Sequence, residues 1–133
     1  MCLYGVVPFH KFGDGSKSKV GSVYVNQKFL IKGDVYFDDQ KELKVLTKDT
    51  VDFTKQHDDK YKPVLIENGV SIVVENIIKN SKYSYNTGLY EYYSIDVEIV
   101  GGKYNGKTLD GTDLFDYEAG HLQYDDTYLE IIK

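Results

Sequence analysis

The sequence is 133 residues long, carries a net charge of −5 and contains a single cysteine, Cys2. This length suits one domain with its own core, and a single cysteine excludes an intrachain disulfide and a zinc site made of cysteines. Its 16 basic residues are all lysines, set against 21 acidic residues, which argues against nucleic-acid binding because such proteins usually carry an arginine-bearing basic patch.

The amino-acid usage favours strands over helices. The chain has one alanine, the strongest helix former, and no tryptophan, but 13 tyrosines. Tyrosine, valine, isoleucine and threonine suit the half-buried surface of a pleated sheet. We therefore predict one all-β domain over 1–133, a small antiparallel barrel or sandwich with little helix. The usual strand length leaves room for roughly eight to ten short strands.

The first half of the chain alternates short apolar runs with polar turns, at the spacing of a β-meander. Residues 10–19 are polar and predict a glycine-bearing loop. The most hydrophilic stretch, 54–62, predicts a long exposed loop and, if the domain has two sub-halves, the place where they meet. The apolar runs predict strands at 3–9, 20–25, 29–32, 35–37 and 43–47.

An asparagine–glycine pair marks a turn near the middle of the chain. Asn68-Gly69 separates the apolar residues 63–66 from a predicted strand at 70–79, which we expect to bend near Asn76. Such a pair favours a type I′ turn, because both central residues of that turn need positive φ. We therefore predict a hairpin between these two strands.

A second pair, Asn105-Gly106, follows the longest strand signal of the chain, which ends at residue 100. It predicts a second hairpin, with a return strand that begins at Thr108. The other predictions for this half are a polar loop at 80–88, irregular structure at 116–126 and a closing strand at 128–132.

The long strand signal lies at 91–100, where apolar and polar residues alternate. This pattern predicts one face in the core and one face in water. The predicted core face carries Tyr93, Ile95, Val97 and Ile99, and the opposite face carries Ser94, Asp96 and Glu98.

Four tyrosines lie just before this strand or within it: Tyr83, Tyr85, Tyr90 and Tyr92. Strand alternation places Tyr90 and Tyr92 opposite the core residues, so we expect both to be exposed. Exposed tyrosines offer a large and rigid contact area, and we predict that these four form a binding surface. Two alternatives would account for the tyrosines without a partner: aromatic ladders that stabilise the sheet, and the base composition of an AT-rich genome.

Residues 97–111, VEIVGGKYNGKTLDG, resemble the strand–turn–strand element of SH3-like barrels of the KOW and bacterial SH3 type. The shared pattern is an apolar strand, a glycine, an aromatic residue and Gly-Lys before the return, occupied by Gly102, Tyr104, Gly106 and Lys107. The resemblance implies a small, strongly bent antiparallel barrel, of families that mostly bind proteins, peptidoglycan or ribosomal components. The acidic charge departs from the nucleic-acid-binding branch, and the lack of tryptophan departs from the proline-peptide-binding SH3 domains.

No motif predicts a catalytic or metal centre. The histidines fall in three separate predicted loops: His10, His57 and His121. Oxygen ligands that calcium could use lie near one glycine: Asp110, Asp113 and Asp116. The spacing of an EF-hand is missing, however, and Asp-Gly pairs are typical of turns. We predict no cofactor and no metal. A small hydrolase with Asp/Glu catalysis remains an alternative, because carboxylate pairs can be judged only from distances.

We therefore predict a non-enzymatic binding protein of inhibitor or immunity-like type. It would recognise a protein with a basic surface through an exposed, acidic, tyrosine-bearing surface, since opposite charge speeds association. The alternative is a cell-envelope or carbohydrate-binding domain whose tyrosines stack on sugars. We expect no nucleic-acid partner, and the oligomeric state does not follow from the sequence.

The sequence also bears on localisation. No stretch is long and apolar enough to predict a transmembrane segment, and the first residues lack the regions of a signal peptide. With one cysteine, the composition predicts a cytoplasmic protein. If Met1 is not native, Cys2 would instead be the lipid-anchored first residue of a processed lipoprotein of the cell envelope.

Overall fold

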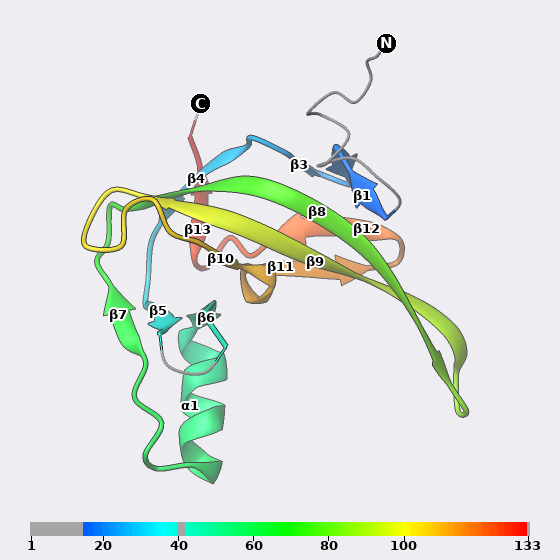
Figure 1. Ribbon diagram of the computed structural model, residues 1–133, viewed down its shortest axis with the longest axis horizontal. Helices are drawn as coiled ribbons and strands as arrows, with labels where there is room; N and C mark the ends of the chain where they lie inside the picture. Colours follow the sequence, from blue (N-terminus) through cyan, green and yellow to red (C-terminus); the bar gives the residue numbers. More distant parts are fainter. Residues whose placement is uncertain (1–14, 40–41, 133) are drawn as a thin grey trace.

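The computed structural model describes residues 15–39 and 42–132 of the chain. Over these residues the chain forms thirteen strands, one α-helix and one short 3₁₀-helix, which confirms the predicted all-β fold with little helix (Figure 1). The strands outnumber the prediction because three of them, near the start of the described chain, are only two residues long.

The elements follow one another with short connections. The strands before residue 70 are β1 (Ser16–Lys17), β2 (Lys19–Val20), β3 (Val23–Tyr24), β4 (Lys28–Ile31), β5 (Val35–Asp38), β6 (Lys44–Thr47) and β7 (Val64–Ile66). The later strands are β8 (Ser71–Ser84), β9 (Gly88–Val100), β10 (Thr108–Asp110), β11 (Phe115–Glu118), β12 (His121–Tyr124) and β13 (Leu129–Ile131). The helices are α1 (Lys48–His57) and η2 (Thr112–Leu114).

One large sheet organises the molecule, in the order β13-β4-β8-β9-β10-β6-β5-β7, with β1 added to β8. Neighbouring strands in this sheet pair antiparallel over the described residues, except β10 and β6, which run parallel at Asp110 and Lys44. The sheet curls strongly, as one side of a small barrel does (Figure 1). Two small hairpins, β2–β3 and β11–β12, form separate sheets.

The core is built on the long hairpin β8–β9. Ile95, Val97 and Ile99 are at most 1% exposed, which confirms the predicted alternation of β9, while Tyr93 is half-buried. In β8 the pairing with β9 shifts by one residue between Val74 and Asn76, a β-bulge at the position where a bend was predicted.

Aromatic contacts join the sheet to the segments around it. The ring of Phe29 in β4 lies 5.8 Å from that of Phe115 and 5.0 Å from that of Tyr124. The ring of Phe37 in β5 lies 4.6 Å from that of Tyr104, in the β9–β10 loop. Each fully buried phenylalanine contributes about 1.5–3 kcal/mol of hydrophobic stabilisation, so these contacts fix the β11–β12 hairpin and this loop against the sheet.

Helix α1 occupies part of the stretch 54–62 that was predicted to be a loop. Thr47 caps its first turn by accepting a hydrogen bond from the backbone N–H of Thr50. The helix ends at His57, and the N–H of Asp58 bonds the carbonyl oxygen of Thr54 at 2.9 Å. Val51 is its one buried residue. The prediction failed because a helix with a single buried side chain shows hardly any apolar periodicity.

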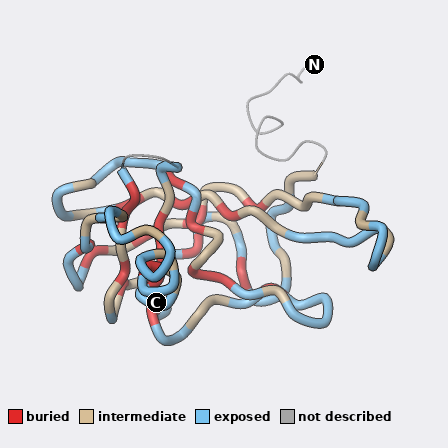
Figure 2. Tube along the Cα trace, turned by 90° about the horizontal axis from the view of Figure 1, so that it is seen from below, coloured by how far each residue is buried: buried red, intermediate tan, exposed pale blue. Residues whose placement is uncertain are grey.

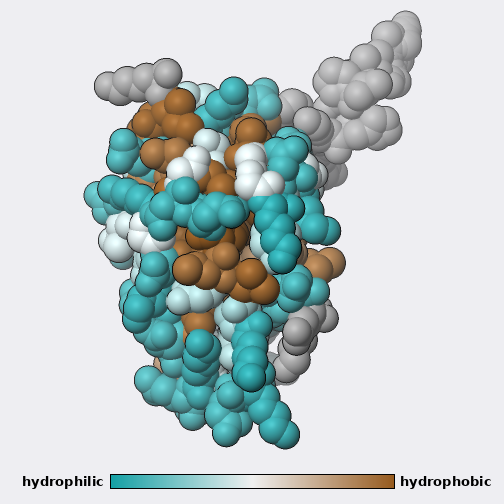
Figure 3. All heavy atoms as spheres, turned by 90° about the vertical axis from the view of Figure 1, so that its left-hand side faces the viewer, coloured by the Kyte–Doolittle hydropathy of each residue, from teal (hydrophilic) through white to brown (hydrophobic). Residues whose placement is uncertain are grey.

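Strand β7 is an edge of the large sheet. Figure 3 faces this side of the molecule and shows hydrophobic atoms gathered among hydrophilic ones. Leu65 of β7 and Val100 at the end of β9 are exposed, to 51% and 41%. Pro63 directly before β7 and the shortness of the strand are features that discourage pairing with other chains.

The two predicted asparagine–glycine hairpins have different outcomes. Asn68-Gly69 turns the chain, but β7 pairs with β5 and β8 pairs with β4 and β9, so that hairpin is wrong. Strands β9 and β10 do pair as predicted. Their connection is the wider loop 101–107, where Gly101, Gly102 and Gly106 have positive φ. Asn105 does not, so the Asn105-Gly106 pair does not form the predicted type I′ turn.

Two segments predicted to lack strands are hairpins. Residues 80–88 mostly continue β8 and begin β9, with a turn between Ser84 and Gly88. Residues 116–126 form most of β11–β12, whose turn residues Ala119 and Gly120 have φ of 51° and 80°, as a type I′ turn requires. Polar and aromatic residues alternate in both segments, so neither shows the apolar face on which strand prediction depends.

Two strands predicted in the first half of the chain have different bounds in the structure. The predicted strand 20–25 is broken at Gly21-Ser22 into β2 and β3. A Cβ atom at Gly21 would lie 2.4 Å from the carbonyl oxygen of Leu122, so β12 can approach only a glycine here. The predicted strand 43–47 begins one residue later, because Leu43 has a φ of 51° and is exposed.

The strands predicted at 29–32, 35–37, 63–66 and 128–132 are confirmed as β4, β5, β7 and β13. The predicted strand 3–9 lies outside the described residues.

Candidate functional site

The most exposed part of the β8–β9 hairpin is its far end, which we call the arm (residues 79–93). Its register runs from Lys79 opposite Tyr93 to Ser84 opposite Gly88, followed by the turn 85–87. The arm projects beyond the rest of the sheet as a two-stranded ribbon (Figure 1). Figure 2 shows that the buried positions lie in the body of the molecule, whereas the end of the arm is exposed.

All four tyrosines of the predicted surface lie on the arm and are exposed. Tyr83 is 67% exposed and Tyr85 97%, while Tyr90 and Tyr92 are 40% and 43% exposed. The rings are arranged in two pairs. The centroids of Tyr83 and Tyr85 are 5.9 Å apart, and those of Tyr90 and Tyr92 are 6.2 Å apart.

The two pairs lie on opposite faces of the arm. Residues that face each other across an antiparallel pair point to the same side of the sheet. Tyr83 lies opposite Leu89, on the face that continues from the buried pair Ile77 and Ile95. Tyr90 lies opposite Lys82, on the other face. We call these the inner face and the outer face. The single four-tyrosine surface expected from the sequence is therefore two smaller surfaces.

The inner face also carries a residue that sequence reasoning missed. Leu89 is 70% exposed next to Tyr83. Nearer the body, the ring of Tyr93 contacts that of Tyr117 in β11, with centroids 4.9 Å apart. Burial and the neighbouring Tyr117 raise the pKa of Tyr93. The strand alternation of β9 could have revealed Leu89 if the strand had been predicted to begin at Gly88.

The arm carries little charge. Its ionisable lysines and carboxylate are Lys79, Lys82 and Glu91, whereas the whole chain has a net charge of −5. Lys79 and Glu91 form an ion pair at 2.6 Å, and the hydrogen bond to Glu91 raises the pKa of Lys79. The expected surface was both tyrosine-bearing and acidic. In the structure the tyrosines lie on a nearly neutral arm, and a group of acidic residues lies elsewhere.

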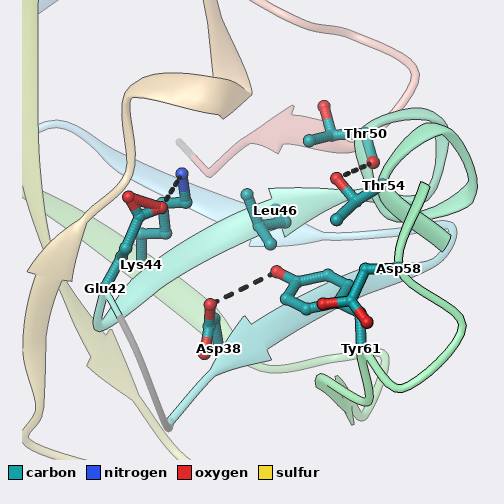
Figure 4. Close-up of a pocket in the computed structure, with 8 residues that line it drawn as sticks. All are labelled: Asp38, Glu42, Lys44, Leu46, Thr50, Thr54, Asp58 and Tyr61. Atoms are coloured by element: carbon teal, nitrogen blue, oxygen red, sulfur yellow. Dashed lines mark hydrogen bonds and ion pairs between the residues drawn. The ribbon is translucent and has the colours of Figure 1, made fainter.

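That group surrounds a pocket of about 200 Å³ between α1 and the strands β5 and β6. The side chains drawn in Figure 4 line it: Asp38, Glu42, Lys44, Leu46, Thr50, Thr54, Asp58 and Tyr61. The hydroxyl of Tyr61 donates a hydrogen bond to Asp38 at 3.3 Å, and Asp38 is only 4% exposed. Burial, with the nearby carboxylate of Asp38, raises the pKa of Tyr61 to about 12. Lys44 pairs with Glu42 at 2.6 Å.

A second hollow of about 400 Å³ continues from Lys44 toward η2. Two of its three carboxylates accept hydrogen bonds from nearby groups. Asp110 accepts a hydrogen bond from the N–H of Thr112 at 2.9 Å, and Asp113 accepts bonds from Thr47 and Thr50. The bond at Asp110 is the turn arrangement predicted for its Asp-Gly pair, whereas the contacts of Asp113 with the start of α1 were not predicted. Among the residues that the structure describes, no group of three or more His, Cys, Asp or Glu side chains is placed to hold a metal ion.

The remaining sequence candidates do not converge. His57 packs edge-on against Phe53 in α1, with ring centroids 4.9 Å apart, while His121 begins β12. His10 and Cys2 lie outside the described residues. Over the described part of the chain, none of the helices has the length and apolar character needed to cross a bilayer.

Comparison with known proteins adds no relative from which a role could be inferred. No protein-family model, no curated protein sequence and no solved structure matches this chain. The resemblance of residues 97–111 to SH3-like barrels therefore stays a prediction.

Proposed function

We propose that this chain is a non-enzymatic protein-binding module that contacts its partner through the arm. One observation carries the proposal. Five large side chains are 40% exposed or more on a single projecting ribbon: Tyr83, Tyr85, Leu89, Tyr90 and Tyr92. Soluble proteins rarely leave such a concentration of large apolar and aromatic surface uncovered unless it serves an interaction.

The residue types suit recognition. A tyrosine places a rigid ring in a contact at low entropic cost, and its hydroxyl keeps the free surface hydrated. Tyrosine is also enriched in protein interfaces, and charged residues are depleted from their centres. The arm matches this composition, because aromatic rings lie on both of its faces and it has few charges.

The negative net charge of the molecule favours a partner with a basic surface. A net charge of −5 raises the rate of encounter with a positively charged surface. In this scheme the acidic pocket side steers the approach and the arm makes the contact, as an inhibitor or immunity-like protein would do. The low cysteine content fits a reducing compartment such as the cytoplasm.

A pull-down with paired variants tests the proposal. The purified chain is used as bait in a lysate of its source organism, next to Tyr83→Ser/Tyr85→Ser for the inner face and Tyr90→Ser/Tyr92→Ser for the outer face. Phe53→Ser is the matched control, because Phe53 is 62% exposed but lies on α1.

We expect at least one arm variant to lose a partner protein that the native chain and the Phe53 variant both retain. Equal recovery by all baits would contradict the proposal. If glycans rather than proteins were lost with the arm variants, the arm would be a carbohydrate-binding surface instead.

A further inference from the structure

Strand β9 has one edge that β10 covers only in part, and the rest of this edge runs along the arm. Strand β10 pairs with β9 only at Asp96, Val97 and Glu98. Among the described residues, the part of β9 from Gly88 to Ser94 pairs with β8 alone. The arm therefore presents a strand edge of the kind that can accept another strand.

The directions of the backbone groups on this edge follow from one residue. The N–H of Ile95 donates to the hydroxyl of Thr112 at 3.0 Å, and its carbonyl oxygen accepts from the N–H of Gly111 at 2.8 Å. Both groups of Ile95 thus point away from β8. Because these directions alternate along an antiparallel strand, Leu89, Glu91 and Tyr93 also turn their N–H and C=O groups outward.

We propose that two copies of this chain pair antiparallel through the β9 edges of their arms, with Tyr90 of one copy opposite Tyr90 of the other on the two-fold axis. A strand edge is self-complementary under such an axis, since residue i meets residue j and j meets i. The outward groups of one copy must meet outward groups of the other, so the axis passes through one residue of the free segment, such as Leu89, Tyr90, Glu91 or Tyr92.

The structure discriminates among these registers. Centring on Glu91 would place two like charges directly opposite, which is destabilising. Centring on Tyr92 would carry Gly88 and the turn of the second copy alongside residues 96–98, where β10 already pairs. Centring on Tyr90 brings Thr87 of the second copy opposite Tyr93, so its turn ends where β10 begins. Centring on Leu89 would also avoid β10, but it would pair only residues 88–90 of each copy. The Tyr90 register pairs residues 88–92 of each copy without meeting β10 and without placing like charges directly opposite.

Charge and packing favour the same arrangement. The arm carries two lysines and one glutamate in a chain of net charge −5, so two acidic molecules repel each other least through their arms. Pairing would convert two isolated ribbons, which are marginal on their own, into a four-stranded sheet. The outer-face tyrosines of both copies would then form one continuous surface. The pairing uses an edge and the proposed partner contact uses faces, so each stands without the other.

Sedimentation of the full chain over a concentration series tests the pairing. The key comparison is Glu91→Pro against Glu91→Ser. Both variants lose the side chain and its ion pair with Lys79, but only proline removes the outward N–H. We expect the native chain and Glu91→Ser to dimerise, and Glu91→Pro to dimerise at least about tenfold more weakly, because two backbone hydrogen bonds are lost. A native chain that stays monomeric, or equal dimerisation of the two variants, would overturn the proposal.

Disulfide trapping tests the register independently and does not depend on the proline variant folding. In a Cys2→Ser background, Tyr90→Cys should give a disulfide-linked dimer, because residues opposite each other in a non-hydrogen-bonded pair have Cα atoms about 4.5 Å apart. Tyr92→Cys is the matched control, since it lies on the same face with similar exposure, but its two copies would be about 13 Å apart. Cross-linking of Tyr92→Cys that equals or exceeds that of Tyr90→Cys would overturn the register.

Discussion

Asp113 holds Thr47 by two hydrogen bonds across the molecule, one from the backbone N–H at 2.8 Å and one from the hydroxyl at 3.1 Å. Thr47 is the N-cap of α1, and Thr50 in the first turn donates to the same carboxylate at 3.1 Å. The helix is thus fixed to η2, and through η2 to the long hairpin, at the end where its free N–H groups favour an anion.

This contact predicts a large effect of a single substitution. Asp113→Ala should lower the free energy of unfolding by about 2–3 kcal/mol, because hydrogen bonds to a charged group are lost and the cap of α1 is weakened. Urea denaturation followed by circular dichroism measures the change. Asp126→Ala, at an exposed position, is the control and should be nearly neutral. Equal effects of the two substitutions would show that the Asp113 contacts do not stabilise the fold.

Asp96 predicts a stabilising substitution with a defined pH dependence. Burial raises its pKa above 3.8, and the charges of Asp110 and Glu75 raise it further, against a hydrogen bond from Asn76 that lowers it. The folded state therefore holds the proton more tightly, so the ionised group opposes folding at pH values above 3.8. Asp96→Asn should raise the free energy of unfolding at pH 7, and the gain should shrink as the pH falls toward 3.8. A gain that is constant with pH would exclude this electrostatic cause.

Tyr61 predicts a late step in the alkaline titration. Its pKa of about 12 lies above the value of about 10 for a free tyrosine. The stability linked to this group is present below pH 10 and is lost as the pH rises through about 12. Tyrosinate absorbance after a rapid pH jump, recorded for the native chain and for Tyr61→Phe, should give a difference curve with its midpoint near 12. A midpoint near 10 would show that the hydroxyl is in water rather than bonded to Asp38.

Ala119 predicts a stabilising change in the β11–β12 turn. It is the one alanine of the chain and has a φ of 51°, a conformation that costs a residue with a Cβ atom roughly 1 kcal/mol. Ala119→Asn should raise the free energy of unfolding by about 0.5–1 kcal/mol, because asparagine adopts this conformation readily. Gly120→Ala should have the opposite effect, because its φ is 80°. Its Cβ would meet no other atom, so the loss would come from the backbone conformation alone. Thermal denaturation of both variants measures the pair of shifts.

The features that were predictable from the sequence are those carried by local alternation. Ile95, Val97 and Ile99 repeat every second residue, and a strand with one buried face follows directly from that repeat. The exposure of Tyr90 and Tyr92 follows from the same repeat. The position of the tyrosines on two faces could be predicted only if the strand β8 was known to continue past Lys79. Beyond that residue both faces carry polar residues, so the apolar alternation that predicts a strand is missing.

Contacts between distant segments were beyond such reasoning. Strand β7 pairs with β5 rather than with the strand that follows it, although an asparagine–glycine turn joins β7 to β8. The acidic pocket brings Asp38 together with Tyr61, and the parallel pairing of Asp110 with Lys44 adds the aspartates near η2. A parallel contact between two short strands has no local signature, so neither hollow could be located before the fold was known.

The bulge in β8 has a consequence for how this hairpin can evolve. Buried side chains are even-numbered before it, at Ile72 and Val74, and odd-numbered after it, at Ile77, because the register with β9 skips Glu75. Deleting that one residue would remove the bulge and leave the later pairs unchanged, with Asn76 opposite Asp96 and Tyr83 opposite Leu89. Natural variants of this hairpin should therefore tolerate the loss of Glu75. Elsewhere they should change length by matched additions or losses in both strands, because an unmatched change turns the following side chains to the opposite face.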